Sequence, residues 1–192
     1  MAGRPRIFDQ GELLSQTIHL FWKNGFEATT TNDLLKEVNL NKGSLYNVFK
    51  SKKELFKAGL TQMEQGGLER LEQRMQESTQ PIEDIKALFY DMVDASFDEH
   101  CKGCILGNSI IEFTGKDEEL KALAIQYLQR FESILQSTLQ RAQTEGLITS
   151  THSPALLSRH LINFWNGINV TRRVYAEKDE LKELIDLNLS FI

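Results

Sequence analysis

Residues 30–49 read TTNDLLKEVNLNKGSLYNVF, and this stretch decides the fold. Leu34 and Val38 are four residues apart and predict one apolar side of a first short helix. Asn39 is one of the few residues other than glycine that tolerate the left-handed backbone of a tight turn. Asn41 is a good N-cap, because its side-chain oxygen can accept a hydrogen bond from an amide of the next helical turn. The stretch therefore predicts two short helices joined by a tight turn.

The second of these helices has an apolar side and an open side. Its buried side is predicted to consist of Leu45, Val48 and Phe49. The open side carries one cation, one glycine and small hydrogen-bonding groups, a combination that suits the major groove of DNA. The open residues are Lys42, Gly43, Ser44, Tyr46 and Asn47. This pattern predicts a helix-turn-helix that binds DNA.

The flanking segments agree with this prediction. A helix is expected over residues 9–24, and Gly25 directly after it is a typical helix terminator. Ser51 and Glu54 have the spacing of a capping box that opens a third, long helix. Residues 2–6 form a short basic arm, which can follow the DNA backbone or enter the minor groove.

The first quarter of the chain resembles the TetR-type (TetR/AcrR) transcriptional regulators. The matching segments are residues 3–6 (GRPR), 25–30 (GFEATT) and 42–52 (KGSLYNVFKSK), and the last is highly specific. Asn39 is a departure, since the family usually has a small residue at this place. The resemblance implies a homodimer whose interface is formed by the last two helices of each subunit. It also implies a small effector that fills a cavity and shifts the two heads out of register with the DNA.

Two roles are expected of residues in the head. Lys42, Ser44 and Asn47 are expected to contact bases, with Gly43 allowing a close approach of the backbone. Phosphate contacts should dominate affinity and make it fall with salt, whereas base contacts set the sequence that is bound. Tyr46 has an alternative interpretation as a partly buried packing residue. The residues expected at phosphates are Arg4, Arg6, Thr30, Thr31, Tyr46 and Lys53.

Composition favours an all-α protein with two domains. The 192 residues include few prolines and glycines, and no segment alternates like a strand. The net charge of −5 divides into +3 for residues 1–57 and −8 for residues 58–192. A weakly basic head on an acidic body can dock on DNA phosphates. We expect a helix-turn-helix domain at residues 1–52 and an effector-binding and dimerisation domain at 53–192, with about nine helices in all.

Several other classes of protein find no support. There is no signal peptide and no apolar run of about 18 residues, so we expect a cytoplasmic protein without a membrane partner. No serine, histidine and acid grouping, phosphate-binding glycine loop or pair of metal-binding carboxylates stands out. We therefore expect neither an enzyme nor a cofactor or metal.

The body is expected to consist of amphipathic helices over residues 52–77, 81–98, 105–113, 116–143, from 154 onward, and 178–190. The last of them is rich in large apolar residues, which on a monomer would be a liability. Self-association is the preferred interpretation, because a symmetric dimer also presents two DNA-binding helices to a palindrome. The alternative is that this helix caps the core of its own chain. The residues concerned are Leu181, Leu184, Ile185, Leu187, Leu189, Phe191 and Ile192.

Aromatic, apolar and amide side chains from separate helices of the body are candidates for an effector pocket. An effector acts only if it binds one dimer geometry more tightly than the other. The alternative is an ordinary core, which such stripes usually form. The candidates are Phe89, Met92, Phe97, Cys104, Asn108, Phe113, Tyr127, Phe131, Phe164, Trp165 and Asn166, with Asn169 as a further polar anchor.

Cys101 and Cys104 follow His100 and are the distinctive chemical groups outside the head. They leave three interpretations open, namely sensing of oxidants or electrophiles, sensing of a metal, and two unreactive structural thiols.

The leading functional hypothesis is a ligand-responsive transcriptional regulator that binds double-stranded DNA, preferably a repressor on a palindromic operator. A constitutive or architectural DNA-binding protein without an effector is the alternative. A thiol enzyme that uses the two cysteines is a third.

Overall fold

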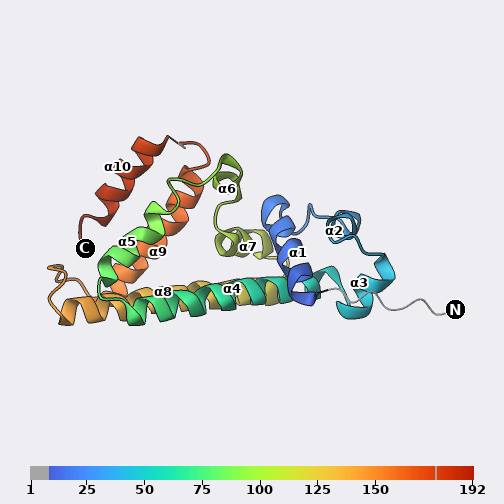
Figure 1. Cartoon of the computed structure of the whole chain (residues 1–192), viewed down its shortest axis with the longest axis horizontal. Coiled ribbons are helices and arrows are strands. Elements are labelled where there is room, and N and C mark those ends of the chain that lie inside the picture. The colour runs from blue at the N-terminus through green and yellow to red at the C-terminus, as the bar shows by residue number, and fades with distance from the viewer. Residues whose placement is uncertain (1–8, 176) are drawn as a thin grey trace. The chain divides into compact units, whose positions relative to one another are not determined.

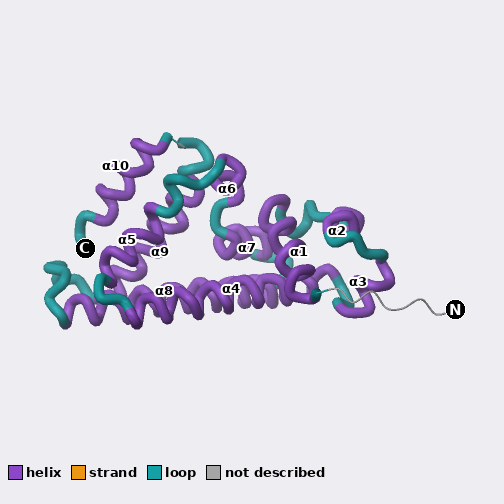
Figure 2. The backbone as a smooth tube through the Cα atoms, in the orientation of Figure 1, coloured by secondary structure: helices purple, strands orange, loops and turns teal. Residues whose placement is uncertain are grey.

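The structure is a computed structural model that describes residues 9–175 and 177–192, apart from the side chain of Tyr46. Its regular elements within these residues are all helices, as the composition predicted (Figure 1, Figure 2). Arg4 and Arg6 of the predicted arm lie outside the described residues. None of the described helices has the length and apolar character needed to span a membrane. The helices are α1 (Gln10–Asn24), α2 (Thr31–Glu37), α3 (Lys42–Val48), α4 (Lys52–Glu77), α5 (Pro81–Tyr90), α6 (Phe97–Lys102), α7 (Ile105–Phe113), α8 (Glu118–Thr144), α9 (Pro154–Thr171) and α10 (Lys178–Leu189).

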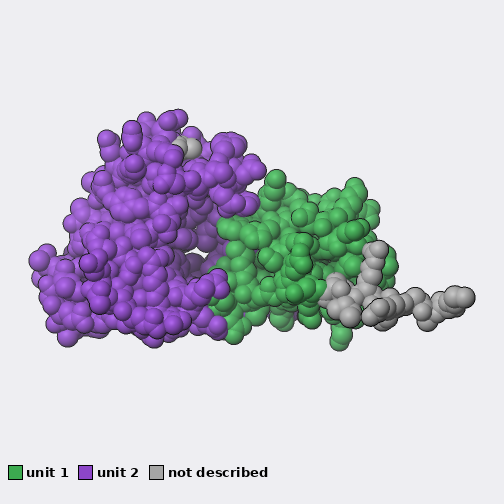
Figure 3. Space-filling model, in the orientation of Figure 1, with its two compact units in different colours: residues 1–66 green, residues 67–192 purple. Residues whose placement is uncertain are grey.

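The chain forms two compact units, Met1–Gly66 and Gly67–Ile192 (Figure 3). The helix α4 begins in the first unit and ends in the second. The predicted head, residues 1–52, falls within the first unit. It contains the predicted helix-turn-helix, which is formed by α2 and α3.

An aromatic cluster forms the core of the first unit. The ring centroids of Phe21, Phe26 and Phe56 lie 5.2 to 5.6 Å from one another, and two of the three pairs meet edge to face. Aromatic pairs in such geometries contribute beyond the area they bury. Gly59 of α4 is buried against α1, where a Cβ atom would lie only 3.0 Å from the Cβ of Ile18. Glycine therefore allows these two helices to approach closely.

The turn between α2 and α3 has the predicted geometry. Asn39 adopts a φ of 50°, in the left-handed region. Its amide donates to the carbonyl of Lys36 at 3.3 Å, and the amide of Leu40 donates to the carbonyl of Leu35 at 3.2 Å. These bonds satisfy carbonyls at the end of α2 that no further helical turn could reach. The prediction of a tight inter-helix turn at Asn39 is confirmed.

The second unit is built around α8. This long helix packs against α5, α7 and α9, while α10 packs against α5 (Figure 1). Leu120, Leu135 and Leu139 of α8 are fully buried. Near its end, Arg141 donates to the carbonyls of Met75 and Gln76 at 2.8 and 2.9 Å and so fixes the end of α4.

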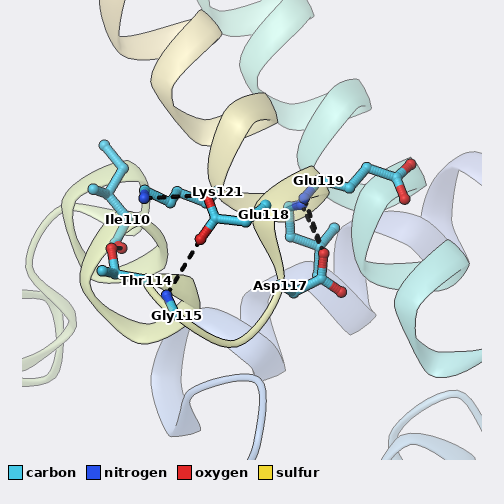
Figure 4. Close-up of polar contacts among 8 residues, drawn as sticks. Ile110, Thr114, Gly115, Asp117, Glu118, Glu119 and Lys121 are labelled. Carbon is cyan, nitrogen blue, oxygen red and sulfur yellow. Dashed lines mark hydrogen bonds and ion pairs between the residues drawn. The ribbon is translucent and has the colours of Figure 1, made fainter.

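The α7–α8 turn shows how sequence ends one helix and begins the next (Figure 4). Gly115 has a φ of 75°, and its amide donates to Oε1 of Glu118 at 3.3 Å. The hydroxyl of Thr114 returns to the carbonyl of Ile110 at 2.6 Å. Asp117 then caps α8, accepting from the amide of Glu119 at 3.1 Å. An acidic N-cap also suits the positive end of the helix dipole.

The single helix predicted over residues 81–98 is wrong, because the chain breaks it. The helix α5 ends at Tyr90, where the amides of Met92 and Val93 donate to carbonyls three residues back. Ser96 then caps the separate helix α6, accepting from the amide of Glu99 at 3.3 Å. The break resets the helical register, so Phe97 at the start of α6 is 70% exposed instead of facing inward. Serine at the N-cap was the sequence signal for this break.

Candidate nucleic-acid interface

The helix α3 presents a polar surface. Lys42, Gly43 and Asn47 are exposed, and Ser44 is half-buried. The side chain of Tyr46, which was assigned both a phosphate contact and a packing role, lies outside the described residues. Val48 was predicted on the buried side but is 41% exposed, since it lies on the last turn of α3 beyond the surface that Leu45 covers.

Three residues fix this helix in place. Asn41 caps it, and its Oδ1 accepts from the amide of Ser44 at 2.8 Å. Leu45 and Phe49 anchor it in the core, with exposed fractions of 1% and 6%. A helix of two turns has little stability of its own, so the cap and the anchors hold its open face in position. Both the cap and these anchors were predicted.

The entry to α2 is a complete capping box. Thr30 Oγ1 accepts from the amide of Asp33 at 3.2 Å, while Asp33 Oδ2 accepts from the Thr30 amide at 2.9 Å and from its hydroxyl at 2.6 Å. These bonds hold the pKa of Asp33 below its ordinary value. Thr31 is half-buried at the start of the helix. Thr29 is fully buried, and its hydroxyl donates to the carbonyl of Gly25 at 2.7 Å.

Lys52 is a residue of the head that sequence reasoning missed. Its Nζ donates to the carbonyls of Phe26 at 2.8 Å and Thr29 at 3.1 Å, and it lies 4.3 Å from the centroid of the Phe26 ring. It therefore ties the start of α4 to the loop between α1 and α2. Lys53, the neighbour expected at a phosphate, is half-buried. The local sequence does not predict which of the two adjacent lysines bonds to these carbonyls, because that depends on the tertiary structure.

In the second unit, four of the expected pocket residues form one aromatic cluster, Phe89, Phe131, Phe164 and Trp165. The ring centroids of Phe89 and Phe164 are 5.1 Å apart, and Trp165 lies 5.8 Å from Phe89 and 5.2 Å from Phe131. Met92, Phe113 and Tyr127 are buried as well. Phe97 is the exception and its pocket assignment is wrong, since the break before α6 places it outside.

The three asparagines that were predicted to line the effector pocket have different hydrogen-bond partners. Asn108 bridges two groups, donating to the carbonyl of Lys102 at 2.8 Å and accepting from Arg173 at 3.1 Å. Asn166 Oδ1 is buried and has no hydrogen-bond partner among the described residues. Asn169 donates to the carbonyl of Trp165 at 2.8 Å and accepts from Arg172 at 2.8 Å. Sequence reasoning missed Arg172, although it follows Asn169 by three residues and so shares its face of α9.

A separate groove of about 220 Å³ lies between α4 and α8 in the second unit. Its lining includes Arg130, Ser133 and Arg141, and none of the predicted effector residues. Arg130 forms an ion pair with Glu72 at 3.2 Å there.

Cys101 is exposed and Cys104 is half-buried, both as free thiols. Cys104 is the N-cap of α7, and its Sγ accepts from the amide of Gly107 at 3.5 Å. Within the described residues no group of three or more His, Cys, Asp or Glu side chains is placed to hold a metal ion.

The apolar residues of the last helix divide into two sets. Leu181, Ile185 and Leu189 are buried in the core of their own chain, as the alternative interpretation proposed. Leu187 is 73% exposed on the opposite face. Leu184, Phe191 and Ile192 are half-buried.

Two domain models of one protein family match the chain. Residues 13–58 match "Bacterial regulatory proteins, tetR family", and residues 81–187 match "Tetracyclin repressor-like, C-terminal domain". The first match spans α2 and α3, and the second spans all of α5 to α9.

Individual relatives extend over the whole chain. The "Uncharacterized HTH-type transcriptional regulator YezE" of Bacillus subtilis is 27% identical, with 99% of each chain covered. The "HTH-type transcriptional repressor ComR" of Escherichia coli is 24% identical over 97% of this chain and 90% of its own.

Solved structures share the fold. A cysteine mutant of the TetR family transcriptional regulator CifR, complexed with 26-base-pair operator DNA, has a TM-score of 0.84 and 20% identity, with 97% of this chain and 98% of CifR covered. The reduced form of E. coli NemR has a TM-score of 0.83 and 21% identity, with 96% and 97% covered. The chain thus belongs to the TetR family, as a DNA-binding helix-turn-helix transcriptional regulator.

Proposed function

We propose that the protein is a ligand-responsive repressor that binds a palindromic operator as a homodimer. The observation that carries the proposal is the open face of α3, a polar surface held by the Asn41 cap and by two buried anchors. Two similar proteins support it, since ComR is a transcriptional repressor and CifR has been solved in complex with operator DNA.

Base reading is assigned to α3. Lys42 and Asn47 are exposed there, and the amide of asparagine and the ammonium of lysine both match groups on base edges in the major groove. Gly43 is exposed between them and has no Cβ to keep the backbone from the DNA. Ser44 contributes a hydroxyl that can contact either type of base pair.

Phosphate contacts are assigned to the rim of the head. Thr30 is exposed at the start of α2, although its hydroxyl is already engaged by Asp33. Thr31 and Lys53 are half-buried, so their contacts would be made by side-chain ends. Arg4, Arg6 and Tyr46 remain proposed phosphate contacts from the sequence pattern. Because these contacts neutralise DNA charge, affinity should fall steeply with salt.

The dimer interface is assigned to α9 and α10. Exposed residues of α9 recur at intervals of four and three, which defines one outward stripe of that helix. Leu156 and Val170 in this stripe are 55% and 62% exposed, Val174 just beyond the end of the helix is 71% exposed, and Leu187 of α10 is 73% exposed. An apolar surface of this kind argues for a partner. A second copy of the chain satisfies it and supplies the second reading helix. The stripe consists of Leu156, His160, Asn163, Gly167 and Val170, and Val174 follows it beyond the end of α9.

Effector binding is assigned to the second unit, near the cluster of Phe89, Phe131, Phe164 and Trp165. The supporting observation is the combination of this aromatic cluster with buried polar atoms that lack partners, such as Asn166 Oδ1. Buried polar groups are nearly always paired, so such atoms mark a place where a ligand could bond. Binding would act on DNA affinity only through a difference in affinity for two dimer geometries.

The test begins with selection of duplexes from a random-sequence pool, followed by fluorescence anisotropy on the enriched sequence. We expect a palindromic consensus. The double variant Lys42→Ala, Asn47→Ala should lose at least about 10-fold in affinity, because each base contact contributes about 1–3 kcal/mol. Lys116→Ala removes an exposed lysine of the α7–α8 turn and should leave binding unchanged. Absence of any enriched sequence, or equal losses in both variants, would contradict the proposal.

Thiol sensing is a second candidate for the regulatory signal. The observation in its favour is the position of Cys104 at the N-cap of α7, where the helix dipole favours a thiolate. The similar CifR structure is of a cysteine mutant, and the NemR structure is of the reduced form. Under this hypothesis, N-ethylmaleimide releases the wild-type protein from its operator and leaves Cys104→Ser bound. Equal responses of the two proteins would exclude it.

A further inference from the structure

Arg172, at the end of α9, is a buried cation without an ion-pair partner among the described residues. It is 7% exposed. Its guanidinium donates to Oδ1 of Asn169 at 2.8 Å, while its Nε has no partner. Burying a guanidinium is costly unless a counter-charge compensates for the lost hydration. The carbonyl end of α9 supplies only a partial negative charge.

The neighbouring charges supply only part of that counter-charge. His100 of α6 is 4% exposed, its Nδ1 also lacks a partner in the part of the chain that the structure describes, and burial and the Arg172 guanidinium together lower its pKa. Glu99 and Cys104 are the groups whose negative charge acts on Arg172. Glu99, however, forms an ion pair with Lys102, and a thiol carries full charge only when it is ionised. The result is a locally positive site in a body that carries a net charge of −8 over residues 58–192.

Three helices meet at this site. Arg173 Nη2 donates to the carbonyl of Lys102 at 2.9 Å, which holds the junction of α6 and α7 against the end of α9. Gly103, in that junction, has a φ of 64°, and a Cβ there would lie 2.2 Å from Arg173 Nη2. Earlier on α9, Asn166 Oδ1 lies 3.2 Å from where a Cβ on Gly107 would be. The site therefore adjoins contacts that fix α6 and α7 to α9.

The same face of α9 connects Arg172 to the aromatic cluster. Asn169 bonds to Arg172 on one side and to the carbonyl of Trp165 on the other. Trp165 in turn contacts the rings of Phe89 and Phe131. Trp165 and Arg172 are seven positions apart, which corresponds to about 10 Å along a helix. One face thus presents a cation at one end and aromatic rings at the other.

We propose that Arg172 binds the carboxylate of a small-molecule effector whose apolar body lies against Phe89 and Trp165. This deepens the proposed effector response and rests on it for the regulatory meaning of the site. A carboxylate matches the guanidinium, because the two groups form charge-assisted and often bidentate hydrogen bonds. Its binding would also alter the hydrogen bond between Arg172 and Asn169, next to Arg173, whose bonds to Lys102 and Asn108 join the end of α9 to α6 and α7.

The first experiment measures binding of 4-phenylbutyrate and of its uncharged amide to the full-length protein by isothermal titration calorimetry. The dissociation constant of the carboxylate should be 5 mM or lower, and the amide should bind at least about 10-fold more weakly. Arg172→Gln should bind the carboxylate at least about 10-fold more weakly than the wild type does. Arg159→Gln, an exposed arginine of the same helix, is the matched control and should bind as the wild type does. No binding of the carboxylate at 5 mM, or undiminished binding by Arg172→Gln, overturns the proposal.

The second experiment requires no ligand. If Arg172 is an uncompensated buried cation, Arg172→Met should raise the melting temperature of the free protein by about 2 °C or more. A lower melting temperature would show that the guanidinium is a structural support, and would overturn the proposal. Neither experiment involves DNA, so the proposed carboxylate site and the proposed function can fail independently. Failure of the wild-type protein to bind any duplex would refute the proposed function without changing the results of the calorimetry or of thermal unfolding.

Discussion

Replacing Lys52 by methionine tests the account of the head most sharply, because methionine keeps the length of the side chain and removes the charge. The substitution removes two hydrogen bonds, at 2.8 Å to the carbonyl of Phe26 and 3.1 Å to that of Thr29, and a cation lying 4.3 Å from the Phe26 ring centroid. Charged hydrogen bonds and cation–π contacts at a half-buried position together contribute about 2 kcal/mol. For a chain of this size the melting temperature should fall by about 4–8 °C.

The assay is thermal unfolding followed by circular dichroism, with Lys50→Met as the control. Lys50 is exposed two residues earlier, so its replacement changes the charge equally but removes none of these contacts. We expect the control to melt within about 1 °C of the wild type. If Lys52→Met also melts within about 1 °C, the tie between α4 and the α1–α2 loop contributes little, and our reasoning about Lys52 is refuted.

Three further predictions concern a helix cap, a buried carboxyl group and the two cysteines. Asn41→Ala removes the cap of α3 and should cost about 1 kcal/mol in stability and weaken DNA binding, whereas Asn41→Asp keeps a capping oxygen and should retain the stability; equal melting of the wild type and both variants would contradict this. Burial raises the pKa of Glu64 to about 7, so the unfolded chain ionises first and thermal stability should fall as pH rises from about 4.5 to 7. Glu64→Gln should flatten that pH profile, and an unchanged profile would refute the assignment. If exposure decides reactivity, Cys101 should react with iodoacetamide faster than half-buried Cys104, as mass spectrometry of labelled peptides can establish; faster labelling of Cys104 would contradict this and favour the thiolate of the sensing hypothesis.

Local chemistry made the head predictable. Asparagine at position 39 predicted the left-handed turn, and Asn41 and Thr30 have the side chains that cap helices. Each of these effects depends on residues within four positions of one another, so no knowledge of the tertiary structure is needed. The inward side of α3 was predicted less well at its end, since Val48 is exposed where the helix runs past its core contacts.

The body was less predictable, because its decisive features depend on which helices meet. A continuous apolar pattern over residues 81–98 concealed the break before Ser96, which turned Phe97 outward. The apolar residues of α10 could face the core or a partner, and only packing against α5 divides Leu181 from Leu187. The burial of Arg172 could not be predicted from the sequence, because it results from the approach of α6 to the end of α9.

Operator recognition as proposed requires that a symmetric dimer present two copies of α3 to one palindrome. The direct measurement compares the affinity of the wild type and of the double variant Val170→Glu, Leu187→Glu for the selected palindrome and for a single half-site. We predict that the wild type binds the palindrome at least about 100-fold more tightly than the half-site, and that the variant, as a folded monomer, loses this advantage. A wild type that is monomeric by sedimentation and binds both duplexes equally would contradict the account.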